Sequence, residues 1–316
     1  MTSNDADRNS GPPSKETVCA LLDRIAPGSI VLTIGSLPGS FSNYTHVVEA
    51  QAANGSVFRI VIRRYAIFGN YDRGEKTRRE FKTLQLLQQN GIPAPSPLYI
   101  DETGAMLGIP GIVTGYVPGE HVTSPSDPMS WAGSLARMLA RVHRIPCGTA
   151  AESFLLDANA EASWFLRSDS MPDYIESYPE GLAVWHQVRS LWPNIEQVPS
   201  GLVHIDYWSG NVLWEGSHIA AVVDWEEAAY GDPGIAVAYC RMDIFLLGLR
   251  EAAEEFLRVY KVEAGGRVAN LGFWELAAAV RPMYNPEGWI TESPAKERFR
   301  EFIADARSKF EGSRAG

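Results

Sequence analysis

A polar segment around residue 206, flanked by apolar stretches, constrains this chain more than any other feature. His204, Asp206 and Asn211 follow the stretch 201–203, and Asp224 follows a second apolar stretch. The residues in between predict a hairpin, which is expected to bring Asn211 and Asp224 back together. Its expected elements are a strand over 211–214, a turn over 215–217 and a returning strand over 218–223.

The spacing of these residues, H-x-D-x-x-x-x-N, is that of a kinase catalytic loop. In such a loop the Asp takes the proton of the acceptor hydroxyl and the Asn binds magnesium. This assigns Asp206 as catalytic base, with Asn211 and Asp224 as the metal ligands. His204 is expected to orient the loop rather than to act as a base. The alternative is that all four are unrelated turn and cap residues.

A glycine-rich segment, 35–43, lies between an apolar run at 30–34 and an alternating run at 44–50. This position predicts the tip of a hairpin, where small residues let backbone N–H groups approach phosphate oxygens closely. An ordinary Gly/Ser turn is the alternative. The predicted phosphate contacts are Gly39, Ser40 and Ser42.

The alternating run 57–64 predicts a strand with Val61 and Arg63 on one face. Val61 is expected to cover the nucleotide base, while Arg63 reaches the phosphates. A helix over 75–89 follows, and its Glu80 is expected to pair with Arg63. The alternative for Glu80 is a weak, exposed ion pair.

Longer motifs carry a resemblance to a known family. They include "REFKTLQLLQQNGIPAPSPL", "GIVTGYVPGEHV", "LVHIDYWSGNVLW" and "AAVVDWEEAAYGDPGIAVA". Across about residues 28–290 the chain resembles the aminoglycoside phosphotransferase family, small-molecule kinases that include choline, homoserine and macrolide kinases. The resemblance implies an α+β, bilobal, protein-kinase-like fold, with a small antiparallel sheet lobe and a larger helical lobe. It also implies that Tyr116 lies in the hinge that reads the base.

Two residues depart from the family pattern. Ile205 occupies a position that is usually Gly, but protein kinases carry Arg there, so a side chain is sterically acceptable. Ala236 occupies a position where the family usually has an Asp that anchors the catalytic loop from beneath. Asp232 is a partial substitute. The departure at Ala236 favours the alternative of a pseudokinase that binds nucleotide but only signals or scaffolds. A protein kinase is disfavoured, because no D-F-G or A-P-E segment is present.

The domain organisation predicted from these patterns has three parts. Residues 1–13 form a disordered tail, 14–115 a nucleotide-binding lobe with the Glu80 helix on its sheet, and 116–316 a catalytic and acceptor-binding lobe. The first helix is expected to begin at the cap Ser14 and to end before Pro27. Further helices are expected over 130–143, 157–192 with turns, 235–262, 271–280 and 295–310.

The composition limits which kinds of molecule the protein is expected to bind. The net charge of −10 argues against nucleic acid and favours a cationic acceptor, although many soluble proteins have a solvating acidic surface. No apolar run is long enough for a bilayer span, and the polar start does not predict a secretory signal. Three scattered cysteines are typical of reduced thiols in the cytoplasm, and no zinc site is indicated. The oligomeric state is not indicated.

Several residues near the two motifs are candidates for acceptor binding. They are Trp208, Glu226, Glu227 and Asp243, although helix capping and core packing are the alternative roles. The predicted reaction is direct transfer of the γ-phosphoryl group of ATP or GTP, with magnesium, to a hydroxyl of a small molecule. ATP and GTP both stay open, as do an antibiotic, an amino alcohol, a sugar and a nucleoside as acceptor.

Overall fold

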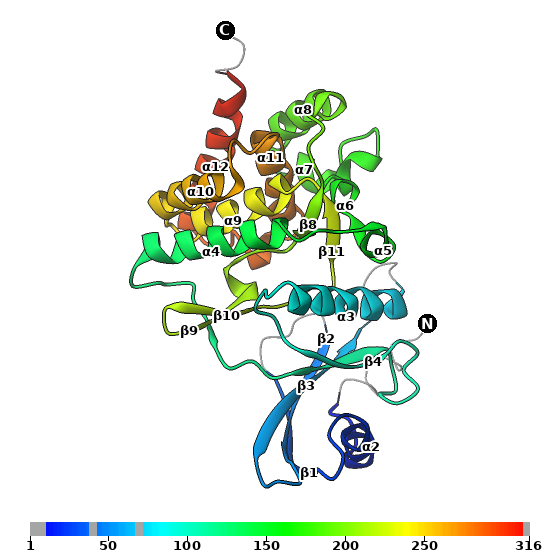
Figure 1. Cartoon of the computed structure of the whole chain (residues 1–316). Coiled ribbons are helices and arrows are strands. Elements are labelled where there is room, and N and C mark those ends of the chain that lie inside the picture. Colours follow the sequence, from blue (N-terminus) through cyan, green and yellow to red (C-terminus); the bar gives the residue numbers. More distant parts are fainter. Residues whose placement is uncertain (1–10, 38–42, 67–71, 312–316) are drawn as a thin grey trace. The chain divides into compact units, whose positions relative to one another are not determined.

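An antiparallel sheet forms the first part of the chain (Figure 1). The structure is a computed structural model that describes residues 11–37, 43–66 and 72–311. The sheet has five strands in the order β1-β2-β3-β5-β4, and the β1–β2 hairpin expected on either side of the glycine-rich segment is present. The strands are β1 (Ile30–Ser36), β2 (Asn43–Gln51), β3 (Val57–Tyr65), β4 (Pro97–Asp101) and β5 (Gly111–Gly115).

Helix α2 (Lys15–Ile25) covers one face of this sheet. It begins where the sequence predicts, because the Ser14 side chain accepts a hydrogen bond from the Thr17 N–H and so caps the first turn. Its apolar stripe packs against Ile60 and Ile62 of β3. Because side chains alternate along a strand, Val61 and Arg63 point to the opposite face.

Helix α3 (Arg73–Gln89) lies against that opposite face, where Glu80 meets Arg63. Its buried residues include charged ones, Lys76, Arg79 and Glu80, beside the apolar Leu84 and others. Charged side chains are almost never buried unless they are paired. A buried helical face of this composition therefore indicates an ion network rather than an apolar core.

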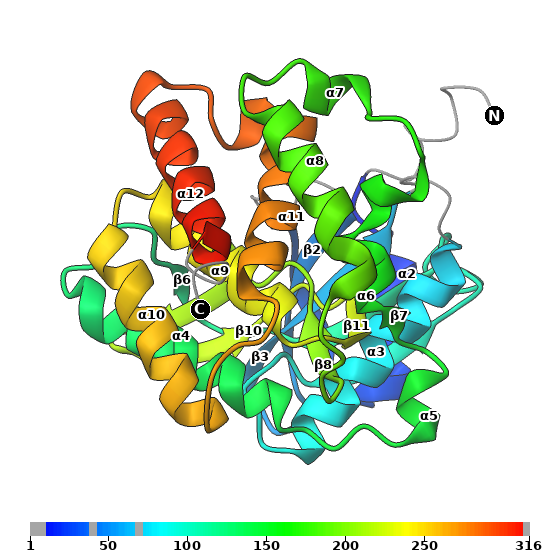
Figure 2. The same cartoon turned by 90° about the horizontal axis from the view of Figure 1, so that it is seen from above.

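The residues 120–219 and 228–316 form a second, mostly helical unit, while 220–227 belong with residues 1–119 in the first. Seen from above, α4 and α10 lie side by side (Figure 2). The longer helices of the second unit are α4 (Pro128–His143), α8 (Gly181–Leu191), α9 (Gly234–Leu246), α10 (Arg250–Ala264), α11 (Leu271–Tyr284) and α12 (Ser293–Glu311). Shorter ones are α5 (Thr149–Glu152), α6 (Ala158–Ala162), η1 (Trp164–Arg167), α7 (Asp173–Glu176), η2 (Trp192–Asn194), η3 (Ser209–Asn211) and η4 (Pro286–Gly288).

The prediction of a single helix over 235–262 is wrong, because α9 and α10 are separate helices. The chain turns at Gly248, which has a φ of +85°. This left-handed conformation costs glycine little and interrupts a right-handed helix. The break could not be recognised in the sequence, because apolar periodicity is present on either side of it.

Short strands position the polar segment around residue 206. β8 (Gly201–His204) pairs antiparallel with β11 (Ala228–Gly231), which pairs parallel with β7 (Leu156–Asp157). A second sheet has the order β10-β9-β6, so the expected hairpin strands are hydrogen-bonded neighbours. These strands are β6 (Glu120–His121), β9 (Val212–Glu215) and β10 (His218–Val222).

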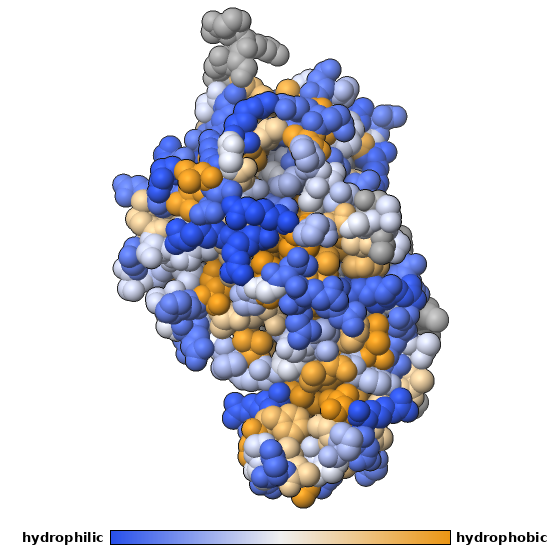
Figure 3. All heavy atoms as spheres, in the orientation of Figure 1, coloured by the Kyte–Doolittle hydropathy of each residue, from blue (hydrophilic) through white to orange (hydrophobic). Residues whose placement is uncertain are grey.

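Apolar side chains are exposed on part of the surface, and the three cysteines differ in burial. In Figure 3 apolar residues gather at the lower end, where Figure 1 labels β1 and α2, and Ile30 and Val57 are exposed. The part of the chain that the structure describes has no helix long and apolar enough to cross a membrane. No disulfide joins the three cysteines, all of which lie in the described residues: Cys19 is exposed, Cys147 intermediate and Cys240 buried.

Candidate active site

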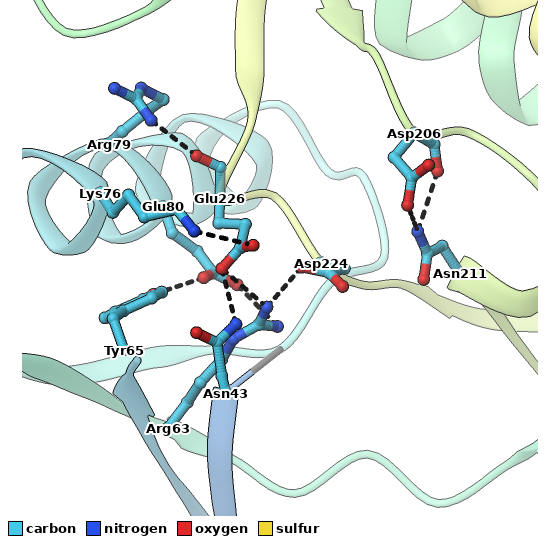
Figure 4. A network of polar contacts seen from close by, with 10 residues as sticks. All are labelled: Asn43, Arg63, Tyr65, Lys76, Arg79, Glu80, Asp206, Asn211, Asp224 and Glu226. Atoms are coloured by element: carbon cyan, nitrogen blue, oxygen red, sulfur yellow. Dashed lines mark hydrogen bonds and ion pairs between the residues drawn. The ribbon is translucent and has the colours of Figure 1, made fainter. Parts of the chain in front are cut away.

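Arg63, near the end of β3, is the centre of a cluster of carboxylates in the first unit (Figure 4). Its guanidinium lies 3.5 Å from Glu80 and 3.1 Å from Glu226, and it also donates a hydrogen bond to Asp224. The Arg63–Glu80 pair expected from the sequence is therefore present. Arg63 is surrounded by more negative charge than one carboxylate would supply.

Glu226 extends this cluster onto α3. Its carboxylate accepts hydrogen bonds from Lys76 at 3.1 Å and from the amide of Asn43 at 2.7 Å. Its backbone carbonyl accepts another from Arg79 at 2.8 Å. The sequence did not identify Asn43, Lys76 or Arg79. Lys76 lies one helical turn before Glu80, so the shared face was a usable signal.

Burial and charge set the ionisation of the two glutamates in opposite directions. Burial raises the pKa of Glu80 to about 7, although Arg63 opposes the shift. The Tyr65 hydroxyl donates a hydrogen bond to the same carboxylate. Burial also acts to raise the pKa of Glu226, but the charges of Arg63 and Lys76 outweigh it and hold that pKa below its usual value.

Asp224 has an unusual backbone for a side-chain-bearing residue, with a φ of +66°. Residues other than glycine adopt this region rarely, although Asp tolerates it better than most. Next to it Trp225 is buried, and its Nε1–H donates to the Val222 carbonyl at 3.0 Å. The buried ring fixes the turn and the strained conformation with it.

In the second unit the candidate catalytic loop follows β8. His204, the last residue of that strand, pairs with Ala228 of β11, so the loop begins from a fixed backbone. Two residues later, Asp206 accepts hydrogen bonds from the Asn211 amide, at 2.8 Å on its Oδ2 and at 2.9 Å on its backbone carbonyl (Figure 4). The structure thus brings Asp206 and Asn211 together as the motif predicts.

Two residues beside Asp206 were missed in the sequence. Arg281 of α11 lies with its Nη1 3.1 Å from Asp206 Oδ1, and its guanidinium stacks 4.5 Å above the ring of Tyr239. Burial raises the pKa of the Tyr239 hydroxyl, and the charge of Asp206 adds to the effect. Both residues come from helices far along the chain, so no local pattern connects them with the motif.

The rest of the loop is held by the helices beneath it. The Tyr207 hydroxyl donates to the Leu135 carbonyl of α4 at 3.0 Å, and the Ser209 N–H donates to Asp243 of α9 at 2.9 Å. At Gly210 a Cβ atom would lie 2.3 Å from the Trp208 ring. Only glycine lets that ring lie against the loop backbone.

The other predicted residues are distributed as follows. Val61 is half-buried on the same strand as Arg63, and Tyr116 follows β5, where its N–H donates to the Arg59 carbonyl at 3.1 Å. Glu227 is half-buried, and the Trp208 ring centre lies 6.0 Å from that of Trp289. The predicted phosphate contacts Gly39, Ser40 and Ser42 lie outside the described residues.

Three acidic residues have contacts that differ from those expected. The carboxylates of Glu226 and Asp243 meet buried protein groups, so their roles in acceptor binding stay predictions. Asp232 was expected to substitute partly for the missing anchor of the loop, and its contacts do not support this role. Asp232 accepts hydrogen bonds at the start of α9 and from α11, with donors Gly234 N–H, Asn270 Nδ2 and Trp274 Nε1 at 2.8, 2.9 and 2.6 Å.

The donor atoms fit magnesium bound together with a nucleotide. The Asn211 amide nitrogen faces Asp206, so its oxygen is directed away from that carboxylate, and Asp224 is partly exposed (Figure 4). Among the described residues no cluster of three or more His, Cys, Asp or Glu could form a dedicated cage. Magnesium usually takes one or two carboxylates plus phosphates and water. Asn211 and Asp224 belong to different units, so a shared metal stays a prediction.

Residues 33–271 match the model of the phosphotransferase enzyme family. Two curated proteins are similar over part of the chain. The mouse acyl-CoA dehydrogenase family member 10 is 24% identical over 215 residues, 59% of this chain and 20% of that protein. The homoserine kinase of Gluconobacter oxydans (strain 621H) is 24% identical over 151 residues, 45% of this chain and 46% of that protein. The matched regions span less than half of either relative.

Solved structures with the same fold cover nearly the whole chain. An aminoglycoside 2′-phosphotransferase-IIIa in complex with GDP has a TM-score of 0.61 at 16% identity, over 92% of this chain and 99% of that one. The macrolide 2′-phosphotransferase MphH of Brachybacterium faecium has a TM-score of 0.57 at 18% identity, over 91% and 97%. The α+β, protein-kinase-like fold expected from the sequence is thereby confirmed.

Proposed function

The chain belongs to the phosphotransferase enzyme family, and from this premise we propose that it transfers the γ-phosphoryl group of ATP or GTP to a hydroxyl of a small molecule. Nucleotide binding is assigned to residues 14–115, and catalysis with acceptor binding to 116–316. Three cysteines that form no disulfide support a reducing compartment such as the cytoplasm.

The observation that carries the proposal is the placement of Asp206. Its carboxylate is fixed by Asn211 at 2.8 Å and Arg281 at 3.1 Å, yet its side chain is 31% exposed to solvent. A general base must be held in one orientation and still be reachable by its substrate. An Asp that served only packing or capping would need neither property.

Each residue then has a distinct task. Asp206 orients the acceptor hydroxyl and takes its proton as the phosphoryl group is transferred. Arg63, with Glu80 and Glu226 beside it, binds phosphate oxygens. Asn211 and Asp224 hold magnesium, which when bound neutralises charge on the phosphates.

The acceptor we propose is an aminoglycoside-type antibiotic or a related metabolite, and an amino-bearing one suits the net charge of −10. The aminoglycoside and macrolide phosphotransferases of the same fold and the homoserine kinase relative support a small hydroxyl-bearing acceptor. Trp208, which is half-buried and follows Asp206 by two residues, is the candidate surface for its rings.

The deciding experiment is phosphoryl transfer by Asp206→Asn. The wild-type protein is assayed with γ-labelled ATP and GTP, magnesium, and a panel of aminoglycosides, macrolides, homoserine and amino alcohols. We expect kcat of the variant to fall about 10²- to 10⁴-fold, the usual contribution of a general base. Nucleotide-dependent thermal stabilisation should persist, because Asp206 is not assigned to the nucleotide.

Asp305→Asn is a matched control, since Asp305 also pairs with an arginine of the helical unit but does not contact the loop. It should transfer phosphate at the wild-type rate. Unimpaired transfer by Asp206→Asn would overturn the assignment. Nucleotide binding without turnover by the wild type would instead favour the pseudokinase alternative.

A further inference from the structure

Asp243 of α9 meets the candidate catalytic loop from the helical side. Its Oδ2 accepts a hydrogen bond from the Ser209 N–H at 2.9 Å. Ser209 stands between Asp206 and Asn211 in the chain, so this bond fixes the backbone that carries both. Asp243 is only 5% exposed. A carboxylate buried that deeply is costly unless hydrogen bonds compensate for the lost water.

The position expected to anchor the loop, 236, holds a fully buried alanine. Asp243 follows it by seven residues on the same helix. Seven residues are close to two turns, so Ala236 and Asp243 share one face of α9. The other candidate, Asp232, directs its carboxylate to the start of α9 and to α11.

We propose that Asp243 is the positioning residue of the catalytic loop, holding Asp206 and Asn211 in register through the Ser209 N–H. The inference rests on the proposed function, in which Asp206 is the base. It gives Asp243 no contact with nucleotide or acceptor. Asp243 lies about two turns along α9 from the alanine at 236, and its bond to Ser209 supports the loop despite that alanine.

The chemistry of the contact favours an anchor. Burial raises the pKa of Asp243 to about 6, against hydrogen bonding to Ser209, and the charge of Asp206 adds to the rise. The group is therefore mostly ionised at pH 7, and a charged acceptor makes a hydrogen bond about twice as strong as a neutral one. Such an anchor matters because a misplacement of about 1 Å can cost about 10²-fold in rate.

The test compares Asp243→Asn with Asp243→Leu, two side chains of similar shape. Asparagine keeps an oxygen that can accept from the Ser209 N–H, whereas leucine leaves that N–H buried and unpaired. We expect kcat of the Asn variant to stay within about threefold of wild type and that of the Leu variant to fall about 10- to 100-fold. KM for the nucleotide should rise less in the Leu variant than kcat falls, because Arg63 and Asp224, which are assigned to the phosphates and magnesium, do not belong to the loop.

A second readout needs neither nucleotide nor acceptor. The Ser209 amide hydrogen should exchange slowly in wild type and Asp243→Asn, and at least about tenfold faster in Asp243→Leu. Glu275→Gln is the control, since Glu275 is another buried acid of the helical unit, paired with Arg241 and Lys309. It should lower thermal stability while leaving kcat and Ser209 exchange unchanged. Adding Ala236→Asp to Asp243→Leu should restore part of kcat.

Equal kcat values for the Asn and Leu variants would overturn the anchor, and so would unchanged Ser209 exchange in the Leu variant. If the Leu variant does not fold, wild type decides alone, because a rapidly exchanging Ser209 amide contradicts the proposal. Absence of transfer by wild type would refute the proposed function. The exchange comparison would still decide the role of Asp243.

Discussion

Two arginines of this protein have partners of the same residue types and differ in accessibility. Arg63 meets three carboxylates in the first unit, and Lys76 shares one of them. Arg241 of α9 also meets three, and one of its partners, Glu275, also binds Lys309. The Arg63 side chain is 16% exposed and that of Arg241 1%.

The difference lies in the backbone that supplies the partners. The carboxylates around Arg241 come from three other helices, α10, α11 and α12, and Glu275 is fully buried. Those around Arg63 include Asp224, which lies in a strained turn and is 32% exposed. The same residue types thus tie helices together in one unit and leave Arg63 and Asp224 partly exposed in the other. The two clusters therefore differ in the accessibility of their side chains and not in their residue types.

The largest effect should come from Arg241→Met. It leaves Glu275 buried without its main cation, and breaking a buried pair in this way costs about 3–5 kcal/mol. Urea unfolding should show this loss, while phosphoryl transfer per folded molecule stays unchanged. A stable variant with impaired transfer would erase the contrast between the two clusters.

Arg63→Met, the matched substitution, should have the opposite profile. Losing charge-assisted hydrogen bonds to phosphate, about 1.5–3 kcal/mol, should reduce kcat/KM for the nucleotide about 10- to 100-fold. Its unfolding free energy should fall less than that of Arg241→Met, because Lys76 still compensates Glu226 and Glu80 can take up a proton. If stability falls by the larger amount and nucleotide use is normal, Arg63 is structural too.

The most gradual effect is the pH dependence of stability that Glu80 contributes. Its pKa in the folded protein, about 7, lies above the ordinary value of 4.5. The folded state therefore binds more protons than the unfolded state between these pH values, and stability falls as pH rises through that window. The slope is at most about 1.4 kcal/mol per pH unit. Urea unfolding of Glu80→Gln from pH 4.5 to 7.5 should lack this fall, and parallel curves would contradict the prediction.

The sequence predicted the parts of the site that local spacing encodes. The motif around Asp206 and Asn211, the Arg63–Glu80 pair and the cap at Ser14 all follow from short patterns. The hairpin strands and the fold class follow from periodicity and from the longer motifs. In each case the information lies within one element or between neighbours in the chain.

What the sequence did not reveal depends on distant contacts. Arg281 reaches Asp206 across 75 positions, and Asn43 reaches Glu226 across 183. The sequence marked Asp243 as a candidate for acceptor binding, which stays a prediction. The anchoring role that we propose for it could not be recognised there, because an acid near a cationic ligand and an acid beneath a loop look alike in sequence. Burial and a backbone donor distinguish them, and both are properties of the fold.

Two of the cysteines differ in burial in a way that allows the opening of this protein to be measured. Cys19 on α2 is exposed, whereas Cys240 on α9 is buried and its thiol pKa is raised by that burial. Reagents attack the thiolate, so Cys240 reacts only when the helical unit opens around it. Timed labelling of Cys240 therefore reports how often the helical unit opens around α9, with Cys19 as the internal reference and no introduced probe.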